Sequence, residues 1–134
     1  MSAPHSPARE VMSRGAFSVD EKLTLRSLAS VLAELDIGAV LVTEPGGSVS
    51  IASERDIVRA LAADADPEEV WAADVTSADL VVADPEESIL DIAERMTTEG
   101  VRHIAIVEHG RIVGVVSARD VLPVLVAYSR ALGV

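Results

Sequence analysis

The sequence predicts an α+β fold made of two copies of one β-α-β-β-α unit. The strongest observation is an internal repeat, because the chain aligns with itself without a gap at an offset of 64 residues. Residues 53–56 (Ser-Glu-Arg-Asp) then match residues 117–120 (Ser-Ala-Arg-Asp). The apolar positions match too, with Leu25, Leu28, Ala29 and Leu32 falling on Ile89, Ile92, Ala93 and Met96. A period of this length indicates a duplicated supersecondary unit, so we expect the function to lie where the two copies meet.

The order of elements in the first copy follows from periodicity and capping residues. Ser6 and Pro7 predict the start of a short helix, with serine as N-cap and proline at the first helical position. A strand is expected at 17–19 and a helix at 24–35, capped by Asp20 or Thr24. The continuous apolar run at 39–42 predicts a strand buried on both faces. A turn at 44–47, a strand at 48–52 and a helix opening at Ser53 complete this copy.

The second copy repeats that order. We expect a strand at 81–83, a helix at 88–99, a hairpin of strands 104–107 and 112–116, and a helix from Ser117. Pro123 should kink or split this last helix. The acidic stretch 64–69 is expected to wind into a short helix with Asp66 as its cap. These expectations divide the chain into a first repeat at 1–63 that includes the N-terminal segment, a linker at 64–74 and a second repeat at 75–134.

Composition excludes several classes of protein. Acidic residues outnumber basic ones by 22 to 11, and the net charge of −11 opposes binding to nucleic acid. The chain has no cysteine, which excludes disulfides, thiolate metal sites and a cysteine nucleophile. Aromatic residues are nearly absent, so the core must be aliphatic. No apolar run reaches the roughly 18 residues needed to span a bilayer, and the N-terminus has no signal core, so we expect a cytoplasmic protein with no membrane partner.

One motif occurs in both copies: an apolar strand runs directly into Ser-x-Arg-Asp at the start of a helix. The pattern is close to a capping box, in which the serine hydroxyl and the acid satisfy backbone amides of the first turn. That role would contribute roughly 1 kcal/mol to the helix and would require no ligand. The same groups can also line a cleft, because a carboxylate accepts hydrogen bonds from ribose hydroxyls and a helix N-terminus favours phosphate. Both interpretations stay open at the level of the motif.

A family resemblance favours the second interpretation. Residues 114–120 (Gly-Val-Val-Ser-Ala-Arg-Asp) resemble the signature Gly-φ-φ-Ser/Thr-x-x-Asp, with φ apolar, of cystathionine-β-synthase (CBS) domains. Residues 101–107 are similar to a segment that lines the same cleft in that family, and residues 36–42 are its counterpart in the first copy. The similarity covers roughly residues 10–126 and implies a stand-alone CBS-domain pair, or Bateman module, with its two repeats related by a pseudo-twofold axis.

The resemblance implies a regulatory protein that binds an adenosine-containing nucleotide in the cleft between the repeats. The ligand would be AMP, ADP, ATP, NAD or S-adenosylmethionine. By resemblance, the two aspartates hold the ribose hydroxyls and the two serines bond ribose or α-phosphate. Arg55 and Arg119 reach phosphate, and backbone near Gly38-Ala39 and near Val101-Arg102 flanks adenine. These positions are Gly38, Ala39, Ser53, Arg55 and Asp56 in the first copy, and Val101, Arg102, His103, Ser117, Arg119 and Asp120 in the second.

The first copy departs from the family pattern at two places. Ser50 stands where the signature has glycine, and Gly38-Ala39 replaces Arg102-His103. Because the second copy therefore carries more positive charge, we expect its site to bind nucleotide phosphates more tightly.

Other functions have less support. His5, His103 and His109 lack the spacing of metal ligands, so no metal site is expected. Neither motif serine has a histidine base at a suggestive spacing, so we expect no enzyme activity and no catalytic residues. The competing hypothesis is a ligand-free dimeric interaction scaffold in which the Ser-x-x-Asp motifs act only as helix caps. We expect a homodimer packed through helical faces that include Leu28, Leu32, Ile92 and Met96, and a protein partner not identified by the sequence.

Overall fold

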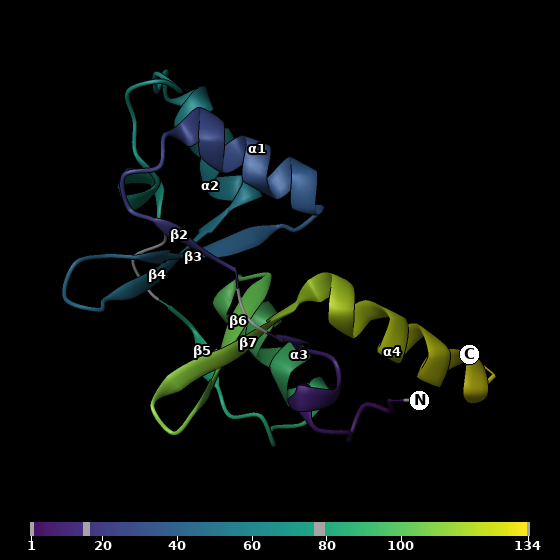
Figure 1. The fold of residues 1–134 in the computed structure, drawn as a ribbon. Helices are drawn as coiled ribbons and strands as arrows, with labels where there is room; N and C mark the ends of the chain where they lie inside the picture. The colour runs from purple at the N-terminus through teal and green to yellow at the C-terminus, as the bar shows by residue number, and fades with distance from the viewer. Residues whose placement is uncertain (1, 15–16, 77–79, 134) are drawn as a thin grey trace. The chain divides into compact units, whose positions relative to one another are not determined.

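The computed structural model describes residues 2–14, 17–76 and 80–133. The chain divides into two compact units. One contains residues Phe17–Leu80, and the other combines Met1–Ala16 with Val81–Val134. Each unit holds one copy of the predicted β-α-β-β-α order, so the predicted α+β fold of two repeats is confirmed (Figure 1).

The unit at residues 17–80 contains a three-stranded sheet in the order β2-β3-β4. Its elements are β2 (Ser18–Asp20), α1 (Leu25–Leu35), β3 (Ala39–Thr43), β4 (Val49–Ser53), α2 (Glu54–Ala62) and the 3-10 helix η2 (Ala72–Val75). Strand β3 pairs in parallel with β2 and antiparallel with β4. The predicted cap Thr24 accepts a hydrogen bond from the Ser27 amide at the start of α1. Asp20, the other candidate cap, instead accepts from the Lys22 amide in the preceding turn.

The other unit contains a four-stranded sheet in the order β1-β7-β6-β5. Its elements are the 3-10 helix η1 (Ala8–Glu10), β1 (Ser13–Arg14), β5 (Val82–Ala83), α3 (Ile89–Glu99), β6 (His103–Glu108), β7 (Arg111–Ser117) and α4 (Ala118–Ala131). The turn between β6 and β7 places His109 and Gly110 at positive φ, as a tight hairpin turn of this kind requires. The predicted hairpin is therefore confirmed.

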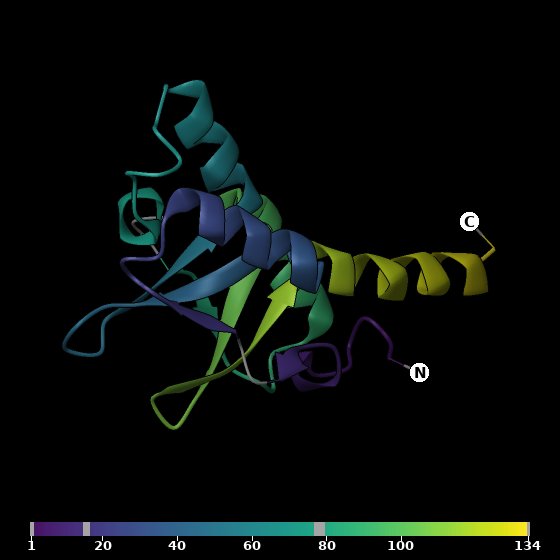
Figure 2. The same cartoon turned by 45° about the horizontal axis from the view of Figure 1, so that its top comes forward.

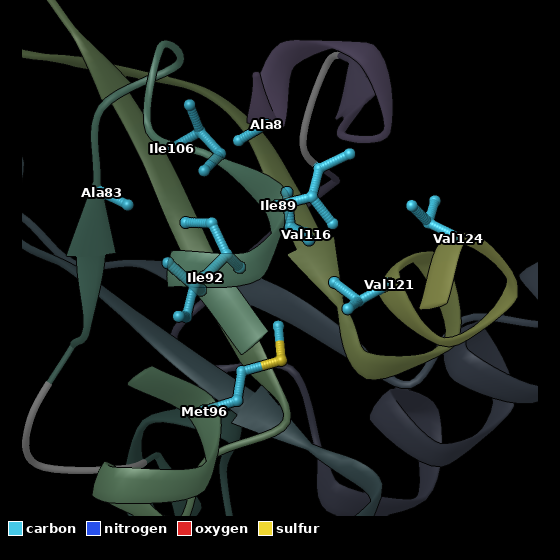
Figure 3. Close-up of a cluster of buried hydrophobic side chains, with 10 residues drawn as sticks. Ala8, Ala83, Ile89, Ile92, Met96, Ile106, Val116, Val121 and Val124 are labelled. Carbon is cyan, nitrogen blue, oxygen red and sulfur yellow. The ribbon is translucent and has the colours of Figure 1, made fainter. Parts of the chain in front are cut away.

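Both cores are aliphatic, as the composition predicts. In the first copy, Leu25, Leu28 and Leu32 from α1 pack with the middle of β3. In the second, Ile89, Ile92 and Met96 from α3 pack with β6, β7 and the start of α4 (Figure 3). Leu28, Leu32, Ile92 and Met96 are thus buried in their own units. The expectation that these four side chains form a dimer surface is wrong, because burial inside each core uses the apolar face of the helix.

Each unit is completed by a segment that the sequence places next to the other copy. The amides of Ala8 and Arg9 donate to the carbonyls of Glu87 and Pro85, at 2.8 and 3.0 Å, and so tie the N-terminal segment to the second copy. The matching bonds, Ala72 to Leu23 and Ala73 to Glu21 at 2.7 and 3.1 Å, tie the linker to the first copy. Ala8 and Ala72 occupy equivalent buried positions. The compact units therefore differ from the sequence division, in which residues 1–16 belong with the first repeat.

Three local expectations need correction. Pro7 is the N-cap of a single 3-10 turn, and no side chain caps that turn. Residues 67–69 form a turn, not a helix, although Asp66 Oδ1 does accept from the Glu68 amide at 2.9 Å. Helix α4 continues through Pro123 without a break. Pro123 is exposed, so backbone groups displaced by its ring face water, and the buried side of α4 at Val121 and Val124 is undisturbed.

Beyond Val124, α4 has no buried residue. Its later turns extend away from the strands of its own unit (Figure 2). Among the described helices, none is long and apolar enough to cross a membrane.

Candidate functional site

The Ser-x-x-Asp motif forms the same hydrogen-bonded corner in both copies. Ser53 is the N-cap of α2, where its hydroxyl accepts from the Asp56 amide at 3.3 Å. The Ser53 amide and hydroxyl both donate to Asp56 Oδ2, at 2.8 and 2.9 Å. The distances between Ser117 and Asp120 at the start of α4 are the same three values. The capping function predicted for both motifs is therefore confirmed.

Capping does not exclude a ligand at these carboxylates. The two bonds that each aspartate side chain accepts from its serine both go to one oxygen, Oδ2. A carboxylate has two oxygens and about four lone-pair directions, so it can cap through one oxygen and accept from a ligand through the other. Asp56 and Asp120 are partly exposed, which leaves both carboxylates reachable from solvent.

A backbone hydrogen bond joins the start of each helix to the residue just before the neighbouring strand, β3 or β6. The Glu54 amide donates to the Gly38 carbonyl at 2.9 Å, and the Ala118 amide donates to the Arg102 carbonyl at 2.8 Å. Strand register places Ala39 opposite Ser53 and His103 opposite Ser117. The predicted site residues of each copy thus lie around the start of its second helix. The first corner contains Gly38, Ala39, Ser53, Arg55 and Asp56, and the second corner contains Val101, Arg102, His103, Ser117, Arg119 and Asp120.

The position of His103 was not apparent from sequence spacing. It lies directly across the sheet from Ser117, on the same face, because paired residues of antiparallel strands share a face. The Ser117 hydroxyl nevertheless gives its single proton to Asp120, not to an imidazole. A serine nucleophile needs a base to take that proton. The arrangement is consequently that of a helix cap with a histidine beside it. The hairpin register, once predicted, would have placed these two residues together.

The signature glycine has a steric role that sequence analysis missed. A Cβ at Gly114 would lie 2.6 Å from the Ser13 carbonyl oxygen and 2.9 Å from Met12 Sδ. Gly114 is therefore required by β1, which pairs with β7 at this position. The corresponding residue of the first copy, Ser50, has a buried hydroxyl with no hydrogen-bond partner among the described residues. A glycine in a strand interior is the signal that could have indicated such a close approach.

No metal centre is formed within residues 2–14, 17–76 and 80–133. In that part of the chain, no group of three histidine, aspartate or glutamate side chains could hold a metal ion. What each corner offers is a half-buried carboxylate, a serine hydroxyl and exposed arginines at the start of a helix.

These corners and the duplicated β-α-β-β-α unit define an α+β protein built as a tandem repeat. The family described as CBS domain matches residues 8–63 and again residues 72–127, and the chain belongs to this family. The family assignment made from residues 114–120 is thus confirmed.

Among curated proteins, hypoxic response protein 1 of Mycobacterium tuberculosis is 30% identical over 116 residues, which cover 85% of this chain and 81% of that protein. The uncharacterized protein MJ1225 of Methanocaldococcus jannaschii is also 30% identical, over 126 residues. The match covers 93% of this chain but only 45% of MJ1225.

Solved structures agree with the fold. The structure of hypoxic response protein I with two coordinated zinc ions has a TM-score of 0.73 at 30% identity, covering 88% of this chain and 98% of that one. The CBS-domain pair of protein MJ0100, in complex with 5′-methylthioadenosine and S-adenosyl-L-methionine, has a TM-score of 0.81. It covers 92% of this chain and 98% of that one, and its 17% identity shows the fold alone.

Proposed function

We propose that this chain is a regulatory module that binds an adenosine-containing ligand through its Ser-x-x-Asp corners. The observation that carries the proposal is the half-buried carboxylate at the start of α2 and of α4, held in the same geometry in both copies. A carboxylate at such a place suits two vicinal ribose hydroxyls, each of which donates one hydrogen bond. The structurally similar MJ0100 pair is described with two adenosine ligands, which supports this ligand class.

The proposed roles follow the family resemblance. Asp56 and Asp120 accept from ribose, and Ser53 and Ser117 contact ribose or the α-phosphate. Arg55 and Arg119, each two residues beyond the serine, reach phosphate. The adenine edge is bound by backbone near Gly38-Ala39 and near Val101-Arg102. The ligand is AMP, ADP, ATP, NAD or S-adenosylmethionine.

Regulation, not catalysis, is the proposed output. A bound ligand would favour one arrangement of the chain, which a protein partner then recognises. The shift in that equilibrium is limited by the difference in the affinity of the ligand for the two states. The engaged hydroxyls of Ser53 and Ser117, which donate to their own carboxylates, support binding over nucleophilic chemistry.

The test is calorimetric titration with AMP, ATP, NAD and S-adenosylmethionine on the unaltered chain and on the Asp56→Ala, Asp120→Ala double variant. The control is Thr24→Ala, Ser88→Ala, because these N-cap side chains bond first-turn amides of α1 and α3 but lie outside both corners. Each variant removes two side chains that stabilise a helix start, worth roughly 1 kcal/mol each. We expect saturable binding that is lost in the aspartate variant and kept in the control. Binding kept in both would show that the aspartates act only as helix caps and that the ligand binds elsewhere. If none of the ligands binds the unaltered chain, the ligand-free interaction scaffold is favoured.

We also propose a homodimer in which exposed apolar residues of α4 contact a second copy. Leu122 and Val126 are 61% and 46% exposed and lie four residues apart, on one side of the helix. Light scattering at micromolar concentration should give twice the mass of the chain. Leu122→Glu together with Val126→Glu should give a monomer. A monomer without any substitution would contradict the proposal.

A further inference from the structure

The two corners share one backbone geometry but carry different charges. At the offset of 64 residues, Asp36 corresponds to Gly100, Gly38 to Arg102 and Ala39 to His103. Glu54, the first residue of α2, corresponds to Ala118, the first residue of α4. The arginine and aspartate of the motif are common to both copies. The changes from Asp36 to Gly100 and from Glu54 to Ala118 therefore remove negative charge from the second copy, and the change from Gly38 to Arg102 adds positive charge to it.

These differences lie close to the proposed site. Glu54 follows the capping serine directly, and its amide bonds to the Gly38 carbonyl at 2.9 Å. Asp36 lies two residues before Gly38, where it ends α1 in the left-handed conformation. In the second copy, Arg102 supplies the equivalent carbonyl to Ala118 at 2.8 Å, and its side chain is exposed. Backbone hydrogen bonds thus hold the substituted positions at the corner of each copy.

The local charges consequently have opposite signs. The first corner holds three carboxylates, those of Asp36, Glu54 and Asp56, against one guanidinium, that of Arg55. The second corner holds one carboxylate, that of Asp120, against two guanidiniums and an imidazole.

The units differ in the same direction. Residues 17–80 contain 13 acidic and 4 basic residues, whereas residues 1–16 and 81–134 contain 9 and 7. The strongly acidic character of the chain is therefore concentrated in the unit that contains the first corner.

We infer that the two copies are specialised for adenosine ligands of different charge. The first copy takes a ligand without phosphate, either uncharged or bearing a sulfonium cation. The second copy takes the phosphorylated nucleotide. This inference rests on the proposed function and adds ligand selection to it: the chain would respond to two classes of adenosine metabolite, one at each corner.

Physical chemistry supports the division. A phosphate at the second corner can form charge-assisted, forked hydrogen bonds with Arg102 and Arg119, a geometry that guanidinium groups favour. At the first corner the same phosphate would lie near the carboxylates of Asp36 and Glu54 as well as Asp56. Three unit charges of difference, acting on a phosphate dianion about 8–10 Å away in water and screened by salt, correspond to roughly a tenfold difference in affinity.

The experiment is NMR titration of the full chain labelled with ¹⁵N, since at 14.1 kDa it gives resolved amide signals. Amides at 54–56 report on the first corner and amides at 118–120 on the second. The probes are two matched pairs: adenosine with AMP, which differ by the phosphate, and S-adenosylmethionine with S-adenosylhomocysteine, which differ by the sulfonium charge. AMP should shift the amide signals of residues 118–120 at about tenfold lower concentration than those of residues 54–56. S-adenosylmethionine should bind the first corner more tightly than S-adenosylhomocysteine.

Two reciprocal variants exchange one charge between the corners. Ala118→Glu should weaken AMP at the second corner by about twofold and leave adenosine unchanged there. Glu54→Ala should strengthen AMP at the first corner by a similar factor. Neither side chain takes part in the capping bonds. Glu69→Ala is the control, because it removes an exposed carboxylate from the same unit but outside the corner, and it should leave the ratio of the two affinities unchanged.

The outcomes separate the two proposals. Equal preference for AMP over adenosine at both corners would overturn charge specialisation and leave adenosine binding intact. The same conclusion would follow if Glu54→Ala and Ala118→Glu did not change the AMP affinities. If none of the four probes affects either set of amides, and ADP, ATP and NAD do not affect them either, the proposed function is wrong and the specialisation fails with it.

Discussion

The substitution Gly114→Ala tests the most sharply defined steric constraint in the molecule. An added Cβ would lie 2.6 Å from the Ser13 carbonyl oxygen, where an ordinary contact begins at 3.4 Å. Strand β1 would therefore have to move by about 0.8 Å, and Met12 would have to change its packing. The neighbour is backbone, so a change of rotamer cannot relieve the contact at Ser13.

The expected loss of stability follows from two terms. Overpacking of a close contact typically costs about 1–3 kcal/mol. If β1 separates from β7, its hydrogen bonds are lost at roughly 1 kcal/mol each, and its pairing covers only Ser13 and Arg14. We therefore expect a decrease of about 2–4 kcal/mol in the free energy of unfolding. That is a large fraction of the roughly 5–15 kcal/mol typical of a domain.

The assay is urea denaturation followed by circular dichroism, together with amide hydrogen exchange in β1 and β7. The matched control is Ser50→Ala, the equivalent position of the first copy. Its hydroxyl is buried without a hydrogen-bond partner in the described part of the chain. Its removal should therefore leave stability unchanged or raise it by up to ~1 kcal/mol. If the free energy of unfolding of Gly114→Ala lies within about 0.5 kcal/mol of that of the unaltered chain, the close approach of β1 is not the reason for glycine at this position.

Two further predictions concern the N-terminal segment and α4. Deletion of residues 2–12 removes Ala8 from the core of the second copy and breaks the bonds from Ala8 and Arg9 to Glu87 and Pro85. Amide hydrogen exchange should therefore accelerate in α3 and β5–β7. Faster exchange confined to α1 and β2–β4 would contradict the observed packing of the N-terminal segment on the second copy. Pro123→Ala should stabilise the chain by about 1–3 kcal/mol in urea denaturation, because alanine restores a backbone donor inside α4. A loss of stability would mean that the proline ring makes a contact that the exposed position of Pro123 does not suggest.

The sequence determined the repeat, the order of the elements and the composition of both corners. Capping chemistry and apolar periodicity are local, so Ser53 and Ser117 could be identified as helix starts from the residues beside them. The same local rules gave the wrong expectation at two solvent-exposed places, Pro123 and residues 67–69. Pro123 lies inside an unbroken helix because its ring is exposed, and residues 67–69 form a turn because that stretch is too short to propagate a helix.

Tertiary structure decided which parts of the chain complete each unit. Residues 8–10 and 72–75 are equivalent in the repeat, yet each packs on the copy that it does not lead into. No local pattern encodes this exchange, because buried alanines such as Ala8 and Ala72 fit either core and only the long-range backbone bonds select one. The glycine requirement at Gly114 has the same origin, since it arises from a strand about 100 residues away in the sequence. The side chains at each corner could therefore be identified from the sequence. Which segments complete each unit was instead decided by packing between residues far apart in the chain.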